Sequence, residues 1–336
     1  MNLTALTQSE GPRRESLTQA LLAVLRAGGR SAVYDDVNAA LGLSFIITSV
    51  QDDPCPGNWS CYGRDFNLAS AAKALGLRIR DLHPPDVSIG LDRAPEYEQH
   101  FDASYRPLIE RALEHGQPVI AWCGWPAPNE QSWGLLTSIG GAGLGYSGVM
   151  AGAAQPASLV GLPIQLYVVE DVDAADPTPS PVWEAARAAL ARVASGDVDP
   201  RVRSRVFSDT YERWGYFIRS QYAHGCQRRG HSIAACHHRL ATTVADARRS
   251  AAEFLRARRD CVPPRFRPQI DGLATSYSNL VLQLADSCAL DRVSRMVGSL
   301  EGLATLRNQV QAAAGFDRSA WKLQRELPPP GLSDDG

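Results

Sequence analysis

The chain has 336 residues, 44% of them hydrophobic and 21% charged, which is enough apolar material for one large domain or two ordinary ones. Its formal net charge of −2 gives no overall field that would favour nucleic acid or a membrane, and no run reaches the roughly 20 apolar residues of a membrane span. Residues 1–15 hold no apolar core of signal-peptide length and the seven cysteines form no CxxC pair, so we expect a cytoplasmic protein with reduced thiols and no cofactor.

The first half of the chain predicts a mixed α/β domain over residues 15–175, preceded by a flexible lead of residues 1–14. The first helix begins at Ser16, places leucines such as Leu17 and Leu21 on one apolar face, and ends at Gly28. The helices that we expect in this half are 16–27, 35–41, 68–75 and 95–115. The strands that we expect are 43–47, 77–82, 119–122, 133–139 and 165–171.

A glycine-rich segment, residues 140–148, separates two of these strands. Its glycines come close to the GxGxxG spacing of dinucleotide-binding loops. That motif, however, must open a helix inside a βαβ unit, and no helix is predicted after it. We therefore interpret the segment as a flexible hairpin between strands.

The pattern changes to helices after a proline-rich linker at residues 173–181. The predicted helices are 182–195, 201–222, 232–258, 266–286 and 290–314. They define a helical domain over residues 182–320. The remaining segment, 321–336, is rich in proline and acidic residues toward its end and is predicted to be a disordered tail.

Several short stretches of the chain resemble a known family. They are Leu17–Gly29, Tyr34–Val37, Leu41–Phe45, Ala71–Leu77, Ile109–Pro118, Trp133–Thr137, Tyr211–Trp214 and Ala247–Leu255. The first half is similar to the N-terminal domain of the butirosin biosynthesis protein H family, a papain-like group. The resemblance implies an α+β fold: a papain-like mixed N-terminal domain with an antiparallel sheet, followed by an all-helical C-terminal domain.

The same resemblance implies acyl transfer by a cysteine at a helix N-terminus, assisted by a histidine and its orienting partner on neighbouring strands. This chain departs from that pattern at both main positions. Ser16 is the nearest equivalent of the cysteine, and Trp133 stands where the histidine is expected. Ser16 also has an ordinary explanation, because Ser16 and Gln19 fit a capping box. Ser16 is thus predicted as a helix cap, with a nucleophile as the alternative.

A dense cluster of side chains lies in the loop predicted over residues 51–63 and just beyond it. Trp59, Tyr62 and Arg64 could hold a planar or anionic ligand, since aromatic faces and a guanidinium suit such groups. Cys61 is a candidate for a displaced nucleophile. The alternative is a folded loop whose aromatic rings pack inward and whose Arg64 pairs with a neighbouring acid.

Two further features are candidates for ligand binding. Trp125 and Trp133, together with Trp122, place three indoles near one strand pair, where they form either core or the wall of a pocket. Glu170 follows a strand, where a carboxylate could orient a base or simply be solvated.

The segment from residue 224 to 238 is the richest in thiols and imidazoles. These side chains suit zinc, but their spacing matches no strong zinc pattern, so we predict packing and surface positions and no metal site. The segment comprises His224, Cys226, His231, Cys236, His237 and His238.

Residues 201–260 carry thirteen arginines against five acidic residues, a balance that could attract nucleic acid. The arginines are spread round several helices, and Tyr211, Trp214 and Ile218 form a stripe at helical spacing with Phe207. We predict that this stripe is core and not a stacking platform for bases, and we do not expect nucleic-acid binding.

Together these features predict a bacterial, non-catalytic protein that binds a small molecule, a peptide or a protein partner and does not associate with membranes. Two alternatives stay open. One is a divergent acyltransferase or amidohydrolase that uses Ser16 or Cys61. The other is a structural protein that forms homo-oligomers through its helical domain.

Overall fold

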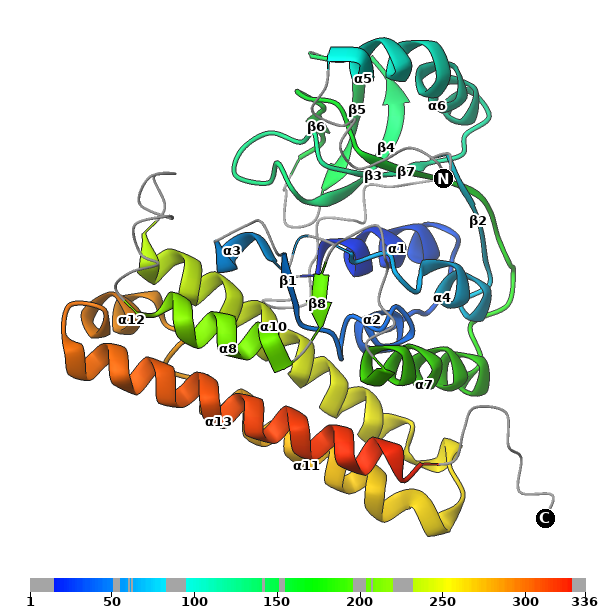
Figure 1. Cartoon of the computed structure of the whole chain (residues 1–336). Helices are drawn as coiled ribbons and strands as arrows, with labels where there is room; N and C mark the ends of the chain where they lie inside the picture. Colours follow the sequence, from blue (N-terminus) through cyan, green and yellow to red (C-terminus); the bar gives the residue numbers. More distant parts are fainter. Residues whose placement is uncertain are drawn as a thin grey trace. The chain divides into compact units, whose positions relative to one another are not determined.

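The residues that the computed structural model of the protein describes are 15–50, 55–59, 61, 63–82, 95–140, 143–150, 155–195, 204–206, 208–219 and 232–327. They fall into two units, shown together in Figure 1. Unit 1 holds the residues up to Val37 and then Leu68–Thr178, and unit 2 holds Asn38–Asn67 and the residues from Pro179 onward. The segment 38–67, which the sequence analysis placed in the N-terminal domain, therefore belongs with the helical half. The predicted lead, residues 1–14, lies outside the described residues.

Unit 1 is built on a six-stranded antiparallel sheet, and unit 2 is largely helical, so the predicted α+β class is confirmed. The strand order is β2-β7-β3-β4-β5-β6. Three of the predicted strands lie side by side as β7-β3-β4 at its centre. The strands are β2 (Leu77–Asp81), β3 (Val119–Trp122), β4 (Trp133–Ile139), β5 (Tyr146–Met150), β6 (Ala157–Ser158) and β7 (Gln165–Val172).

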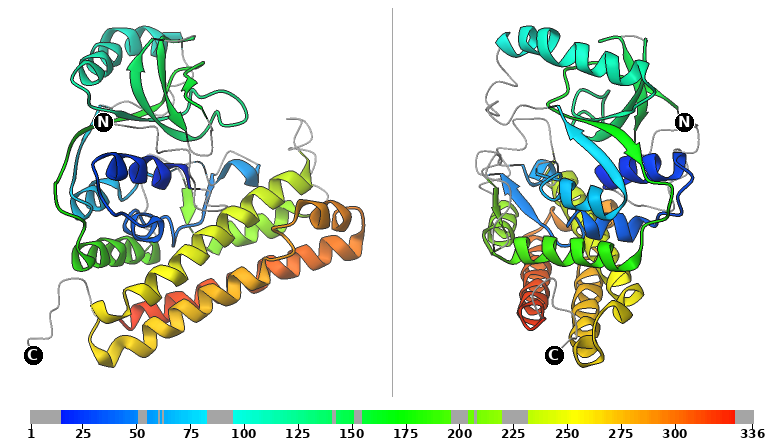
Figure 2. Two further views of the ribbon diagram at one scale, coloured as in Figure 1. Left: turned by 180° about the vertical axis from the view of Figure 1, so that it is seen from behind. Right: turned by 90° about the vertical axis from the view of Figure 1, so that its right-hand side faces the viewer.

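A helical stretch from residue 95 to 114 covers one face of the sheet (Figure 2). Its rings at Tyr97, Phe101 and Tyr105 are buried against the sheet residues Val119 and Leu136. The predicted single helix is interrupted by a π-helical turn, because Pro107 has no N–H to continue the α-helical ladder. The three parts are α5 (Pro95–His100), η3 (Phe101–Tyr105) and α6 (Arg106–Glu114).

Two other helices of unit 1 pack against the sheet. The N-terminal helix α1 (Ser16–Ala27) packs on β4, and α4 (Leu68–Ala74) packs on β2. The predicted helices at 16–27 and 68–75 are therefore confirmed.

The glycine-rich segment is a hairpin, as predicted. It joins β4 to β5, and the N–H of Gly140 donates to the carbonyl of Gly145 at 2.7 Å. Gly143 has a φ of +71°, and a Cβ there would lie 2.2 Å from the carbonyl oxygen of Leu159. Gly143 is therefore required for a close approach of two backbones.

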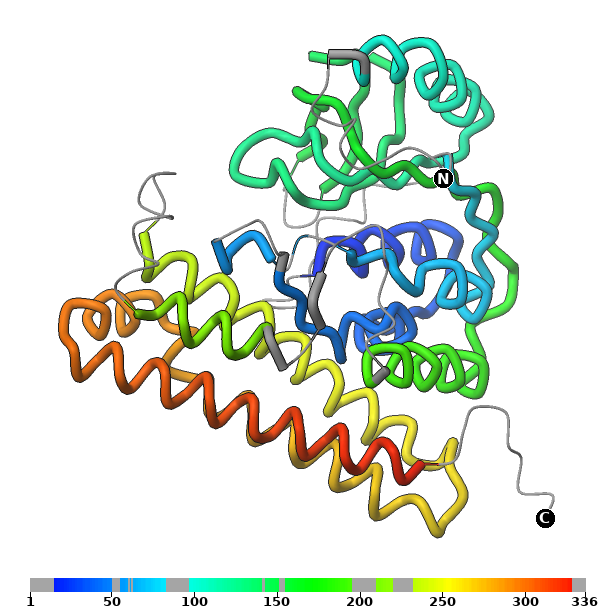
Figure 3. Tube along the Cα trace, viewed as in Figure 1, coloured from blue at the N-terminus to red at the C-terminus, as the bar shows by residue number. Residues whose placement is uncertain are grey.

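Three long helices of unit 2 run side by side (Figures 1 and 2). α11 (Arg267–Gln283) packs against both α10 (Ile233–Ala257) and α13 (Leu300–Arg325). The short α12 (Leu290–Met296) lies between the ends of α11 and α13 (Figure 3). The remaining helices are α3 (Pro56–Trp59), α7 (Pro179–Ser195) and α8 (Ser208–Phe217), while α2 (Tyr34–Ala40) contains the boundary between the units.

In unit 2, several predicted helices and strands differ from those in the structure. Residues 41–45 form turns instead of a strand, and the strand β1 (Thr48–Val50) begins later. The predicted helix 201–222 contains β8 (Ser204–Val206), which pairs with β1, before α8 begins. β1 and β8 pair with each other in a two-stranded ladder, and local helical periodicity cannot reveal a pairing between segments so far apart in the chain.

The predicted helix 290–314 is two helices that part at Gly298. Ser299 starts the second one by accepting a hydrogen bond from the N–H of Gly302 at 3.0 Å. This second helix, α13, then continues to Arg325, with Ala320 fully buried. Part of the predicted disordered tail is therefore helical, and within it the side chain of Leu323 packs beside Gly272 of α11. Residues 328–336 lie outside the described part of the chain. No helix among the described residues is both long and apolar enough to cross a membrane.

A fully buried ion pair joins α10 to α13. Arg248 donates to both carboxylate oxygens of Asp317 at 2.8 and 2.7 Å, and it also donates to the carbonyls of Ser44 and Ile46. Tyr211 of α8 donates to the same carboxylate at 2.7 Å. Burial alone would lower the pKa of Arg248, but the charge and hydrogen bonds of Asp317 outweigh it and raise that pKa. Arg248 therefore stays charged, and its hydrogen bonds together with that of Tyr211 tie four segments together.

We predict that Asp317→Asn lowers the free energy of unfolding by about 3–5 kcal/mol, because it leaves the Arg248 charge buried without a counter-ion. Urea denaturation followed by circular dichroism measures this change. The matched control is Asp271→Asn, which breaks a bidentate pair with Arg259 on the surface and should have little effect. Equal effects of the two substitutions would contradict the prediction.

Candidate functional site

Ser16 and Trp133 meet at the N-terminus of α1. The backbone N–H of Trp133, the first residue of β4, donates to the hydroxyl oxygen of Ser16 at 3.1 Å. The two residues are 117 positions apart in the chain. The structure therefore brings together the two positions at which the resemblance implied a nucleophile and its base.

The predicted capping box at Ser16 and Gln19 is wrong. The residue in the cap position is Glu15, and it makes no side-chain cap bond. The backbone N–H of Glu15 donates to the hydroxyl of Tyr34 at 3.2 Å. Ser16 is the first residue inside the helix, so its hydroxyl is directed by the contact with β4 instead.

The chemistry of this pair differs from that of a nucleophile and a base. An activated serine needs a neighbouring group that takes its proton. The backbone N–H of Trp133 is a donor, and an indole nitrogen is also only a donor. Neither group of Trp133 can therefore accept the proton of Ser16.

Aromatic rings surround Trp133 on one face of the sheet. Trp133 lies opposite Trp122 in the β3–β4 register, and Tyr167 follows on β7. The ring centroids of Trp122 and Tyr167 lie 6.2 and 6.0 Å from that of Trp133. Alternation along the strands places these three rings on the face opposite the one that α6 covers. Tyr167 was not singled out from the sequence, although strand alternation around Gln165 would have placed it there.

The indole N–H of Trp133 is unusual in this group. Trp133 is only 1% exposed, and its N–H has no hydrogen-bond partner among the described residues. The indole N–H of Trp122, by contrast, donates to the carbonyl of Gln131 at 3.1 Å. A buried donor without a partner is costly and calls for a physical explanation.

Trp125, which was predicted to bind a ligand together with Trp133, lies elsewhere. It is fully buried in the core between the sheet and the helical stretch 95–114, and its N–H donates to the carbonyl of Ala121 at 3.3 Å. Trp125 and Trp133 thus occupy opposite faces of the sheet and do not form one pocket wall.

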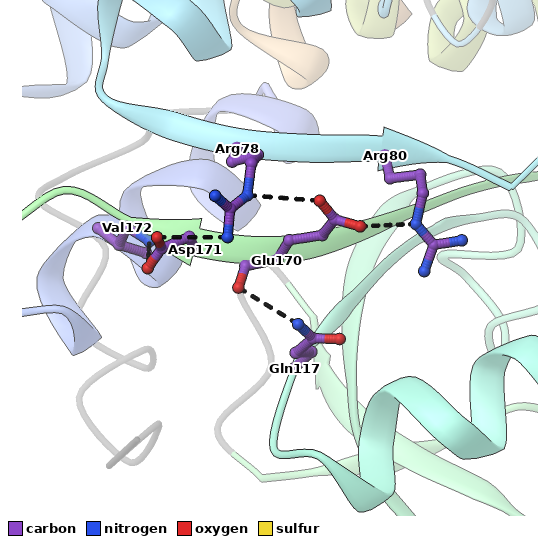
Figure 4. A network of polar contacts seen from close by, with 6 residues as sticks. All are labelled: Arg78, Arg80, Gln117, Glu170, Asp171 and Val172. Carbon is purple, nitrogen blue, oxygen red and sulfur yellow. Dashed lines mark hydrogen bonds and ion pairs between the residues drawn. The ribbon is translucent and has the colours of Figure 1, made fainter.

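Glu170 takes part in a cross-strand ion-pair network at the edge of the sheet (Figure 4). Its carboxylate lies 3.4 Å from Arg78 and 2.7 Å from Arg80, both on β2. Asp171 pairs with Arg78 as well, and Gln117 donates to the carbonyl of Glu170. The register between β2 and β7 shifts at this point, so Glu170 is the extra residue of a β-bulge. The network binds the edge strand and is separate from the Ser16–Trp133 contact.

The loop cluster predicted around residue 61 belongs to unit 2. Trp59 is 2% exposed, with the guanidinium of Arg213 stacked 5.1 Å from its ring centroid. Arg64 is also 2% exposed, whereas Cys61 is half-buried and accepts a hydrogen bond from Arg239 at 3.6 Å. Tyr62 lies outside the described residues. Ser16 and Cys61, the two candidate nucleophiles, are therefore in different units.

His237 is part of a buried hydrogen-bonded chain. The indole N–H of Trp214 donates to its Nδ1 at 3.0 Å, so the ring proton lies on Nε2 and is donated to Ser287 at 3.0 Å. Ser287 in turn donates to Gln309 at 2.7 Å. Because His237 donates to Ser287, it cannot act as the base for that serine. Burial, followed by the nearby His238, lowers the pKa of His237 to about 3.

The remaining predictions for this region concern metal binding and the aromatic stripe. No group of three or more His, Cys, Asp or Glu side chains that could hold a metal occurs within the described ranges, and His224, Cys226 and His231 fall outside them. Tyr211, Trp214 and Ile218 are buried, so the prediction that these residues are core is confirmed; the side chain of Phe207 is not among those described.

Comparisons with known proteins give no further information on this site. No protein-family description matches the chain, and no curated protein matches it.

We predict that His237 makes unit 2 less stable in acid. The pKa of His237 is about 3 in the folded chain and near 6.5 when unfolded, so protonation favours the unfolded state. The stabilisation is fully present above about pH 6.5 and is lost as the pH falls from there toward 3. The melting temperature of a His237→Gln variant should therefore fall less steeply with acidification than that of the parent. The exposed His115→Gln control should keep the parent slope, and identical slopes in all three proteins would refute the assignment.

Proposed function

We propose that this chain is a non-catalytic, papain-like binding protein whose ligand or partner presents a hydrogen-bond acceptor, such as a peptide carbonyl, to Trp133. The observation that carries the proposal is the contact between Ser16 and Trp133. A helix N-terminus and a central strand meet there as a papain-like site requires, but a serine and a tryptophan occupy the two positions.

The surroundings of Trp133 support binding in place of catalysis. A tryptophan fills the volume of a histidine and more, yet it cannot exchange a proton at neutral pH. Its N–H has no partner within the described ranges, and the nearby rings of Trp122 and Tyr167 are also buried, so a single polar group stands in apolar surroundings. Binding sites for small molecules and peptides commonly combine these two properties.

Trp133→Phe tests the binding role, because it keeps an aromatic ring and removes only the N–H and part of the ring. A screen of small carboxylates, amides and short peptides by thermal shift should yield a compound that raises the melting temperature of the parent protein and raises that of Trp133→Phe much less. One lost hydrogen bond corresponds to roughly a tenfold weaker affinity.

The matched control is Trp125→Phe, which removes an indole N–H from the opposite face of the same sheet. This variant should bind the compound as the parent does. If Trp133→Phe binds equally well, or if no compound binds the parent, the proposed role of Trp133 fails.

The same protein tests the enzymatic alternative at Ser16. A fluorophosphonate probe labels serines that a base activates, and it should leave Ser16 unlabelled because Trp133 provides no base. Labelling that is present in the parent and absent in Ser16→Ala would show that the chain is a serine enzyme instead.

Acyl transfer through Cys61 is a second candidate function, supported by one observation. Arg239 donates to the Cys61 sulfur, and a neighbouring guanidinium favours the thiolate that such chemistry needs. If Cys61 is the nucleophile, iodoacetamide should alkylate it several-fold faster than the similarly half-buried Cys261 and Cys288, and Arg239→Gln should remove the difference. Equal rates at the three cysteines would exclude this candidate.

A further inference from the structure

Two buried cysteines meet in unit 2. The sulfur of Cys55, just before α3, lies 3.2 Å from the sulfur of Cys236, in the first turns of α10. The two residues are 181 positions apart and are 0% and 4% exposed. No spacing in the sequence pointed to this pair, because only the fold brings the two segments together.

The backbones around the two sulfurs hold them in place. Ser232 caps α10 by accepting from the N–H of Ala235 at 3.0 Å, and the N–H of Cys236 donates to the carbonyl of Ser232. On the other side, α3 packs directly on α10. A Cβ on Gly57 would lie 3.4 Å from the Cα and 3.6 Å from the sulfur of Cys236. The contact between the sulfurs therefore follows from the packing of α3 on α10.

We propose that Cys55 and Cys236 are a redox pair that forms an intramolecular disulfide when the protein is exposed to a peroxide. A disulfide has a sulfur–sulfur length of about 2.05 Å, so the two sulfurs need to approach by roughly 1.2 Å. Small rotations of the two side chains can supply that movement. The pair is independent of the binding role proposed for Trp133.

The reaction balances with hydrogen peroxide as the two-electron oxidant. One thiolate attacks the peroxide bond, which gives a sulfenic acid and, after protonation of the leaving oxygen, one water. The second thiolate then attacks that sulfur, forms the sulfur–sulfur bond and displaces hydroxide, which leaves as a second water. In sum, two thiols and one peroxide give one disulfide and two waters.

The bond would fasten the segment before α3 to the start of α10. Because the closed loop spans many residues, the cross-link should stabilise unit 2 and raise its melting temperature by roughly 5–10 °C. Addition of a thiol reductant should reverse the shift.

Peptide mapping of the full chain tests the pair directly. The protein is treated with hydrogen peroxide, its remaining thiols are blocked with iodoacetamide, and it is digested without reduction. Trypsin leaves Cys55 and Cys61 on one peptide, residues 31–64, and Cys236 on another, residues 230–239. A further chymotryptic cut after Trp59 separates Cys55 from Cys61. The expected product links the Cys55 and Cys236 peptides, disappears with dithiothreitol and comes from monomeric protein on a non-reducing gel.

Matched variants identify the partners. Cys61→Ser should keep both the cross-link and the rise in melting temperature, whereas Cys55→Ser and Cys236→Ser should lose both. If the serine variants do not fold, the peptide map of the parent protein still decides. A cross-link that involves Cys61, or oxidation of Cys61 while Cys55 and Cys236 remain reduced, would overturn the proposal.

Discussion

The structure of unit 2 depends on the buried charge of Arg248. A guanidinium taken fully out of water must have a counter-ion and acceptors for its N–H groups. Asp317 supplies the charge, and the carbonyls of Ser44 and Ile46 supply further acceptors. The side chain thus fixes α10 against α13 and holds the turn near residue 45 to both. This requirement explains why the segment 38–67 belongs to the helical half despite its position in the sequence.

The same interaction explains why the predicted strand at residues 43–47 does not form. Its apolar side chains fit a buried strand equally well, and Phe45 is indeed buried. Its carbonyls, however, turn toward Arg248, which lies about 200 residues away in the sequence, and cannot join a sheet ladder. Local patterns identified the central strands of unit 1 because β3, β4 and β7 contain apolar runs, and β3 pairs with both of the others. Local patterns gave the wrong secondary structure where a distant polar group determines the conformation of the backbone.

The candidate site was likewise predictable only where its structure depends on local sequence. The sequence predicts the helix that begins at Ser16 and the strand that begins at Trp133, and the resemblance brings the two together. The sequence does not show that the hydroxyl of Ser16 accepts a hydrogen bond from the backbone N–H of Trp133, because a capping box fits the local sequence just as well. The positions of Trp125 and Glu170 could not be predicted either, because they depend on which face of the sheet is covered and on a bulge in β7.

Helix α10 carries two of the buried polar side chains that connect it to α13. His237 and Arg248 are eleven residues apart, close to three helical turns, so they lie on similar sides of α10. His237 reaches Gln309 of α13 through Ser287, and Arg248 reaches Asp317 of the same helix. These two polar connections fix the register between the helices, because a slip of one turn would separate Gln309 from Ser287 and Asp317 from Arg248. Apolar packing alone would tolerate such a slip, so the polar residues give unit 2 a single arrangement.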